Sequence, residues 1–287
     1  MEPDKAVDDA LEVLADGLTL EEVHAGDSHT ALVVSGMDDP QVVNALGLYL
    51  VGLLAGVVRT NLQLSTALLD TTPEGRQQLA ADVEARLEPS VNDSQWTIDH
   101  FDADVRDPWI AEGVGHAILA VRGRAATPCL GGSVAALSVP HSKPTQQGLD
   151  LVAIYDEDGL PAVALGEAKA TVDNGSSRLT ESIGFFREVE MGSRDLEIRM
   201  QVVLLQEALS DPLRRGLSGT FWRNRACFLP LIAHGDDFDI RASRPALLAL
   251  SRPPTHKRVI HCRPPAYDEF FDGIAAAMQL AVATINP

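Results

Sequence analysis

Two short apolar runs separated by a turn constrain the fold of this 287-residue chain more than any other feature of its sequence. The first run covers residues 148–155 and the second covers residues 162–169. Runs of this length bounded by glycine, proline and aspartate are typical of β-strands, and a short connection between two of them is typical of a β-hairpin. We therefore expect a hairpin in the middle of the chain, with residues 156–159 as its loop.

Three charged residues interrupt the two apolar runs, namely Asp150, Glu167 and Lys169. Residues two apart in a strand share a face, so Glu167 and Lys169 project the same way. A four-residue loop places Asp150 opposite Leu165, and therefore diagonal to Glu167 on the same face, with roughly 7 to 8 Å between the backbones. A shift of one residue in this register would move Asp150 to the other face. The pattern predicts that two carboxylates and one amine converge.

Such a cluster on an apolar hairpin costs free energy unless its members pair with one another or bind an ion. A salt bridge at the end of the sheet is the structural alternative. Carboxylate oxygens suit Mg²⁺, which leaves its other coordination positions to water and phosphate. A lysine beside the ion can activate the attacking water and stabilise developing negative charge. We expect a site for metal-assisted hydrolysis.

The order of these residues resembles the active-site motif of the PD-(D/E)XK nuclease superfamily. Asp150 stands for the aspartate, and Glu167, Ala168 and Lys169 stand for the (D/E)XK element, while Leu149 replaces the proline of the motif. A glycine two residues before Asp150, a glycine directly before Glu167 and a long helical stretch after them are more narrowly similar to the nuclease subunits of the Hachiman antiphage systems, the HamA family. The resemblance covers about residues 107–234.

The resemblance implies a restriction-endonuclease-like core and a Mg²⁺-dependent DNA endonuclease in which Mn²⁺ can substitute. In that case Asp150, Glu167 and the Ala168 carbonyl hold the metal, and Lys169 activates water. It also implies a glutamate ligand from the helix before the sheet, a position that Glu112 matches. The alternative for Glu112 is a solvated side chain hydrogen-bonded to His116, one helical turn away.

The same resemblance implies a helicase partner and a role in defence against phage. The runner-up function is a non-catalytic module with a nuclease fold that binds nucleic acid or a partner protein. Other chemistries lack their motifs, since the chain has no GxGxxG, GxxxxGK[ST], GxSxG or HExxH pattern. His256, His261 and Cys262 lie close in sequence, but without a second matching pair they do not indicate zinc.

The net charge of −18 is distributed unevenly along the chain. Residues 1–110 hold 5 Lys and Arg against 21 Asp and Glu, whereas residues 210–265 hold 10 against 4. We therefore expect an acidic N-terminal region, 1–106, that could contact a partner, and a nuclease-like domain, 107–287. DNA contacts are expected from the basic segment, because phosphate is bound by cationic side chains.

The residues expected to contact DNA are four arginines around a predicted strand at residues 226–233 and one lysine before the hairpin. They are Arg214, Arg215, Arg223, Arg225 and Lys143. The alternative is that these side chains are solvated or form surface ion pairs, which contribute little to stability.

Three cysteines without a CxxC pair indicate neither a disulfide framework nor a zinc ribbon, and the chain is expected to be cytoplasmic. Residues 42–58 carry no charge, but they fall short of the roughly 20 apolar residues that a membrane span needs. We expect a buried helix there.

Local patterns predict helices at about 5–16, 40–58 (continuing to 69), 73–87, 107–121, 177–209 with a break at Gly192, and 267–284. They predict strands at 30–34, 130–139, the hairpin, 226–233 and, as an edge strand, 259–262. Around the hairpin, the order is α-β-β-β-α-β. The expected class is therefore α/β, a mixed sheet flanked by helices, with a mainly helical acidic N-terminal region.

Overall fold

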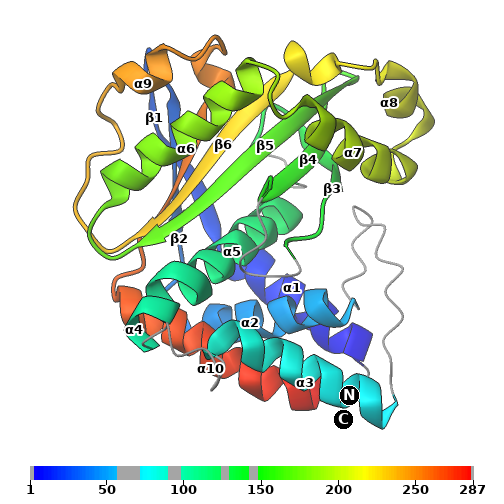
Figure 1. The fold of residues 1–287 in the computed structure, drawn as a ribbon, viewed down its shortest axis with the longest axis vertical. Coiled ribbons are helices and arrows are strands. Elements are labelled where there is room, and N and C mark those ends of the chain that lie inside the picture. The colour runs from blue at the N-terminus through cyan, green and yellow to red at the C-terminus, as the bar shows by residue number, and fades with distance from the viewer. Residues whose placement is uncertain (1–2, 57–71, 90–97, 124–128, 142–147, 286–287) are drawn as a thin grey trace.

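The computed structural model describes residues 3–56, 72–89, 98–123, 129–141 and 148–285. In these residues the chain forms an α/β fold around a seven-stranded mixed sheet in the order β1-β2-β7-β6-β5-β4-β3 (Figure 1). The expected α/β class is confirmed. The strands are β1 (Thr19–Ala25), β2 (Thr30–Ser35), β3 (Ser133–Leu137), β4 (Leu151–Glu157), β5 (Leu160–Thr171), β6 (Ala226–His234) and β7 (Arg258–Cys262).

Helices cover both faces of the sheet, and a separate hydrophobic core lies on each face. One core contains side chains of α1 (Pro3–Gly17), α2 (Pro40–Ala55), α3 (Pro73–Leu87), α5 (Asp107–Arg122) and α10 (Tyr267–Ile285). The other contains side chains of α6 (Gly175–Glu190), α7 (Asp195–Leu205), α8 (Asp211–Gly216) and α9 (Pro245–Leu248).

Residues 98–122 form one continuous helical stretch, in which α4 (Ile98–Phe101) and a π-helical turn (Asp102–Arg106) lead directly into α5. The two regions expected from the charge distribution, 1–106 and 107–287, meet within this stretch. Both regions also contribute to the same sheet and to the same core, since β2 pairs with β7 and α2 packs against α10.

The strand β7 is interior to the sheet, so the expectation of an edge strand at 259–262 is wrong. Parallel pairing with β6 on one side and β2 on the other encloses β7. The pairing with β2 joins residues more than 220 positions apart, and no local pattern around β7 carries that information.

The helix α2 lies where the uncharged run was expected to form a buried helix. Half of its sixteen residues are buried, and it packs against α1 and α10. The expected continuation of this helix to residue 69 falls largely outside the described residues. None of the described helices is both long and apolar enough to cross a membrane.

The hairpin forms as expected, but its register differs from the expected one by two residues. Only Asp158 and Gly159 connect β4 to β5, and Leu151 pairs with Gly166. Both connecting residues have positive φ, 55° and 81°, which is the conformation that a two-residue type I′ turn requires. Asp156 accepts a hydrogen bond from the Gly159 amide over 2.7 Å. A shift of two residues keeps every side chain on its expected face.

The small residues of β5 face α5. Ala162, Ala164 and Ala168 belong to the core that contains α5, whereas Val163 and Leu165 belong to the core on the other face. Thirteen of the sixteen residues of α5 are buried, because these small side chains let the helix pack closely on the sheet. The opposite face of β5, which carries Glu167 and Lys169, is therefore turned toward α6 and α7.

The turn geometry gives a direct test of the hairpin register. Replacing Gly159 by Ala should destabilise the protein by about 1 kcal/mol, because a residue with a Cβ rarely adopts positive φ. A Cβ at this position meets no atom within 4 Å, so packing adds nothing to the cost. Gly184→Ala within α6, where a Cβ also meets nothing, should instead stabilise by about 0.5 to 1 kcal/mol. Denaturant midpoints of the two variants measure both effects, and equal shifts in the same direction would contradict the turn.

Candidate active site

The candidate active site lies at a corner of the sheet where one strand stops and its neighbour continues. β4 begins at Leu151, opposite Gly166, while β5 runs on to Thr171. Asp150 lies directly before β4, and its Oδ2 accepts a hydrogen bond from the Ala168 amide over 2.7 Å. The Asp150 carboxylate thus accepts the hydrogen bond that a backbone carbonyl would accept if β4 were longer. Because the N–H and C=O of one strand residue point to the same side, the Ala168 carbonyl also faces this corner.

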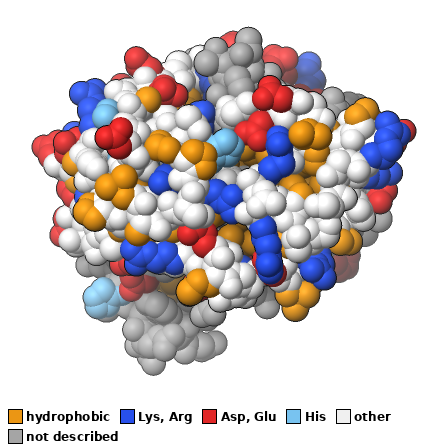
Figure 2. All heavy atoms as spheres, turned by 90° about the horizontal axis from the view of Figure 1, so that it is seen from above, with side chains coloured by type: hydrophobic (Ala, Val, Ile, Leu, Met, Phe, Trp, Pro, Cys, Tyr) orange, Lys and Arg blue, Asp and Glu red, His pale blue; other side chains and the backbone are white. Residues whose placement is uncertain are grey.

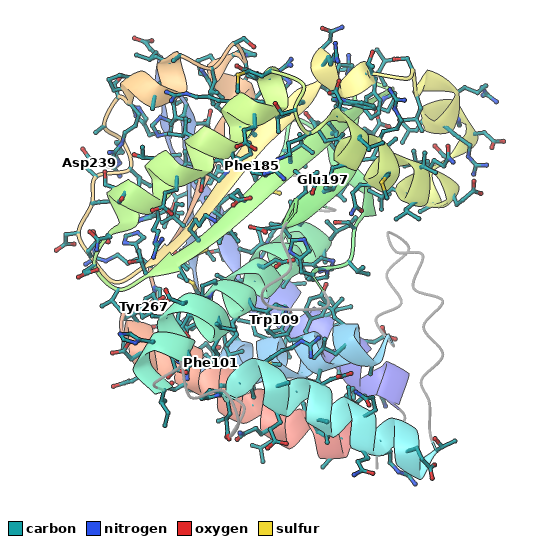
Figure 3. The ribbon with its side chains drawn as sticks, viewed as in Figure 1. Phe101, Trp109, Phe185, Glu197, Asp239 and Tyr267 are labelled. Atoms are coloured by element: carbon teal, nitrogen blue, oxygen red, sulfur yellow. The ribbon has the colours of Figure 1, made fainter. Side chains whose placement is uncertain are left out.

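The segment before Asp150 is held by α7. The Leu149 amide donates a hydrogen bond to Glu197 Oε1 over 2.7 Å. Gly148 has a φ of 155°, and a Cβ added there would lie 2.8 Å from the same carboxylate oxygen. Figure 3 shows Glu197 beside the end of β4. The close approach of α7 explains a glycine at position 148 and fixes the direction from which Asp150 enters the corner.

Glu167 and Lys169 project from β5 toward the same cavity as Asp150. Lys169 Nζ lies 2.7 Å from Glu167 Oε1, and Glu167 is only 7% exposed. The second carboxylate oxygen, Oε2, is enclosed and has no hydrogen-bond partner among the described residues. The structure therefore brings together the two carboxylates and the amine that the hairpin pattern predicted, with one acceptor oxygen left over.

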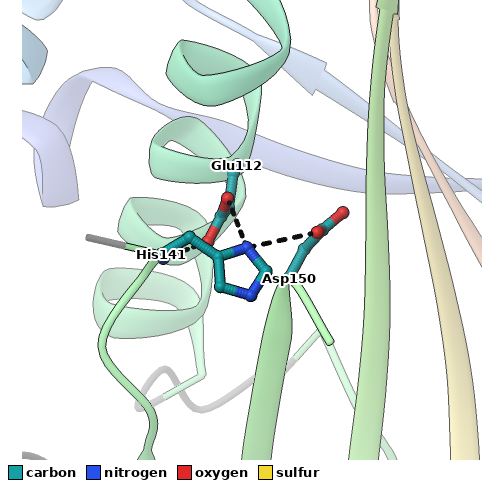
Figure 4. Close-up of side chains that lie close together, drawn as sticks. All are labelled: Glu112, His141 and Asp150. Atoms are coloured by element: carbon teal, nitrogen blue, oxygen red, sulfur yellow. Dashed lines mark hydrogen bonds and ion pairs between the residues drawn. The ribbon is translucent and has the colours of Figure 1, made fainter. Parts of the chain in front are cut away.

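Glu112 joins this group from α5 through His141, which sequence reasoning did not select (Figure 4). Glu112 Oε1 accepts a hydrogen bond from the His141 amide over 2.6 Å, and Oε2 lies 3.3 Å from the imidazole Nδ1. The same Nδ1 lies 3.6 Å from Asp150 Oδ1. Glu112, His141 and Asp150 each offer one ligand atom, and these three atoms lie within 4.8 Å of one another.

The alternative environment for Glu112, a solvated side chain bonded to His116, does not fit the structure. Glu112 is 5% exposed, and both of its carboxylate oxygens contact His141. The two ring nitrogens of His116 are bonded to the Tyr49 hydroxyl and to the Ser138 carbonyl, over 2.7 and 2.8 Å. Trp109, also on α5, donates to the His141 carbonyl over 3.0 Å and so holds the loop residue against Glu112.

The cavity between these side chains has a volume of about 290 Å³. Besides the residues above, it is lined by Phe185 of α6 and by Arg194, which lies directly before α7. Arg194 bonds to Glu188 over 2.9 Å and to Glu197 over 3.2 Å, and its guanidinium lies 4.8 Å from the Phe185 ring centre. These contacts hold the Arg194 side chain at the cavity.

The arginines expected to contact DNA lie elsewhere. Arg225 bonds to the Pro161 carbonyl and to Glu157 over 3.1 and 2.7 Å, and its own carbonyl accepts from Val163. Val163 is six residues before Lys169 on β5, which corresponds to about 20 Å along the strand. Arg225 therefore holds the hairpin end of the sheet.

The other three arginines expected to contact DNA are also absent from the described lining of the cavity. Arg223 is paired with Asp195, Arg214 lies 4.0 Å from Glu207, and Arg215 is exposed on α8. Lys143 lies outside the described residues. In the face drawn in Figure 2, basic side chains are scattered among apolar and acidic ones and form no continuous basic patch. Of the described residues that line the cavity, Lys169 and Arg194 carry the permanent positive charge.

Burial and mutual repulsion of the carboxylates perturb the titration of the site. Burial, followed by the charges of Glu167 and Glu112, raises the pKa of Asp150 to about 8. Burial also raises the pKa of Glu167, although Lys169 opposes this shift. Burial alone would lower the pKa of Lys169, but the Glu167 carboxylate outweighs it and the pKa is raised. The hydrogen bond with Glu112 raises the pKa of His141.

These features fit a hard divalent cation. Three carboxylates line one cavity, Glu167 Oε2 lacks a partner among the described residues, and the raised pKa of Asp150 reflects the cost of assembling the negative charge. A dication would offset that repulsion and satisfy the remaining oxygen. Asp150, Glu167, the Ala168 carbonyl and Glu112 are the oxygen donors available to it, and His141 adds a nitrogen donor.

No protein-family model matches the chain, and its sequence has no significant match among curated proteins. The geometry and electrostatics of the site are therefore the basis on which a function is proposed.

The raised pKa of Asp150 predicts how stability depends on pH. Its value of about 8 in the folded protein exceeds the ordinary 3.8, so the folded state binds the extra proton over this range and stability falls as pH rises through it. In EDTA, the melting temperature of the wild type should fall relative to that of Asp150→Asn between about pH 5 and pH 8. Added Mg²⁺ or Mn²⁺ should raise the melting temperature of the wild type most at the upper end of this pH range. A constant difference in melting temperature between the two proteins at all pH values would contradict this assignment.

Proposed function

We propose that this protein is a Mg²⁺-dependent DNA endonuclease with a restriction-endonuclease-like core, in which Mn²⁺ can replace Mg²⁺. The proposal is carried by the convergence of Asp150, Glu167 and Lys169 on one cavity at the corner of β4 and β5. The element order α5-β3-β4-β5-α6-β6 supports it, as does the resemblance of the motif to PD-(D/E)XK nucleases. The same resemblance supports DNA as the substrate.

The proposed roles follow from the chemistry of each side chain. Asp150, Glu167, the Ala168 carbonyl and Glu112 would hold the metal, which when bound polarises the scissile phosphate and acidifies its water. Lys169 has a raised pKa and is therefore an ammonium at neutral pH. In this state it orients the attacking water and stabilises the negative charge that develops on the phosphate.

Arg194 is proposed to position the substrate. Its links to Glu188, Glu197 and Phe185 fix the guanidinium at the cavity before DNA arrives, so little side-chain entropy is lost on binding. A preformed guanidinium suits a phosphate next to the scissile one, because it can donate two hydrogen bonds to phosphate oxygens.

We further propose a role in antiphage defence with a helicase partner, in the cytoplasm. The similarity of the motif to the Hachiman nuclease subunits supports this role. The charge of residues 1–110, with 5 basic against 21 acidic residues, supports region 1–106 as a partner surface, since a DNA-binding surface would carry the opposite sign. Truncation within this region that leaves partner binding unchanged would count against it.

One observation favours a second candidate, a nuclease-fold module without catalysis that binds nucleic acid or a partner protein. Lys169 pairs with Glu167, and His141 lies between Glu112 and Asp150, so cationic or polar groups of the chain itself already meet the carboxylates. A fold can retain such an internally paired cluster for stability alone. Nicking experiments distinguish the two candidates.

Lys169→Ala and Asp150→Ala should each reduce plasmid nicking in Mg²⁺ by at least about a hundredfold, since each removes a group that acts on the transition state. Lys169→Ala removes the ammonium group, and Asp150→Ala removes a metal ligand. Nicking is measured on supercoiled plasmid with and without EDTA. The control is Arg199→Gln, an exposed residue of α7 whose replacement should leave nicking unchanged. Metal-dependent nicking that survives in purified Lys169→Ala would overturn its role, and nicking by none of the proteins would favour the second candidate.

Arg194→Gln should weaken DNA binding by about tenfold, because it removes a charge-assisted contact at the cavity. Binding is measured with a labelled duplex in Ca²⁺, which keeps the site loaded without turnover. The matched variant is Arg215→Gln, which tests the basic surface expected from the sequence. A larger loss in Arg215→Gln than in Arg194→Gln would place the DNA on α8 instead.

A further inference from the structure

A second cavity, of about 480 Å³, shares no lining residue with the candidate active site. It is lined by residues of β1, β2 and β7 and by the loop 238–241 that follows β6. Because β2, β7 and β6 are parallel, their carboxyl ends lie at one edge, which is where open α/β sheets bind ligands. Asp239 marks this loop in Figure 3, well away from Glu197 and Phe185. The volume falls in the range of about 300 to 1,000 Å³ that is usual for small-molecule sites.

A chain of hydrogen bonds inside the fold determines the tautomer of His261, the histidine at this cavity. Asp236 Oδ1 lies 2.9 Å from Nδ1 of His234, so this nitrogen carries the proton and donates it to the carboxylate. The Nε2 atoms of His234 and His261 are in contact, and His234 can only accept there. His261 therefore carries its proton on Nε2, and its Nδ1 has a bare lone pair.

The bare nitrogen is an unused acceptor. His261 is 9% exposed, it lines the cavity, and its Nδ1 has no hydrogen-bond partner among the described residues. Burial, together with His234 and Arg263, lowers the pKa of His261 to about 3, so the ring is neutral at pH 7. A neutral imidazole fixed in this tautomer accepts a hydrogen bond from a ligand N–H or O–H.

The other lining side chains define the rest of the ligand. Most are apolar, and they include Val23, Val33 and Ile240. The charged side chains at the cavity are two arginines and two aspartates, all exposed: Arg241, Arg263, Asp38 and Asp239. Arg263 pairs with Asp237, whereas the Arg241 side chain has no hydrogen bond or ion pair to the rest of the described chain. An anionic group would find its counter-charge at Arg241.

We infer that this cavity binds a small organic anion with an apolar body and a hydrogen-bond donor. The donor contacts Nδ1 of His261, the body packs on Val33 and its apolar neighbours, and the anionic group pairs with Arg241. Both an aromatic carboxylic acid and a nucleotide have this chemistry, since each combines an N–H or O–H donor with a negative group.

A matched set of probes separates the three features of the ligand. Indole-3-acetate carries the donor, the apolar body and the anion; 1-naphthaleneacetate lacks the donor, and indole lacks the anion. Titrations by isothermal calorimetry and by backbone amide NMR should show saturable binding of indole-3-acetate, with the other two about tenfold weaker. Adenosine monophosphate and inorganic phosphate form the second arm. Tighter binding of the nucleotide than of the indole acid identifies a nucleotide as the ligand source, and the reverse identifies an organic acid.

Variants place the binding in the cavity. Arg241→Gln should weaken indole-3-acetate about tenfold without affecting the fold, because the side chain is exposed. Val33→Trp should abolish binding by filling the cavity, and Arg199→Gln on α7 should change nothing. The inference is overturned if neither indole-3-acetate nor the nucleotide binds saturably, if inorganic phosphate alone binds, or if both cavity variants bind as the wild type does. Because nicking does not depend on this cavity, the result stands apart from the proposed nuclease activity.

Discussion

The hydrogen bond from the Ala168 amide to Asp150 is the interaction on which the candidate active site depends. It closes the corner where β4 begins and β5 runs on past it, and it holds the Asp150 carboxylate level with Glu167 on the neighbouring strand. A carboxylate here does what a strand residue would otherwise do, which is to satisfy a backbone donor. The corner thus needs an acid for its own structure, and the same acid is positioned for chemistry.

The repulsion among the carboxylates at this corner explains why cationic and polar side chains surround them. Each buried carboxylate loses hydration, and the repulsion among three of them adds to that cost. Lys169 offsets part of it at Glu167, and His141 offsets part of it between Glu112 and Asp150. The oxygen of Glu167 that stays without a partner among the described residues shows that the compensation is incomplete. A divalent cation would complete it, and in that case the cost of folding is linked to the ability to bind metal.

Local sequence patterns could predict the hairpin, the small-residue face of β5 and the helices on either side, because each depends on residues close in sequence. The two-residue turn was also predictable, since an Asp-Gly pair favours a type I′ turn, but the expected loop included two extra residues, 156 and 157, which belong to β4. The pairing of β2 with β7 and the contact of His141 with Glu112 were not predictable in this way. Each joins residues that are at least 29 positions apart, and the sequence around one partner does not indicate the other.

We propose that the acids at the corner of β4 and β5 coordinate a divalent cation. An anomalous difference map from Mn²⁺-soaked crystals tests this coordination most directly. The account predicts a manganese peak bounded by Asp150, Glu167 and Glu112, with the Ala168 carbonyl among its ligands. A map with no peak at this corner, recorded at saturating Mn²⁺ with Lys169 still paired to Glu167, would contradict it.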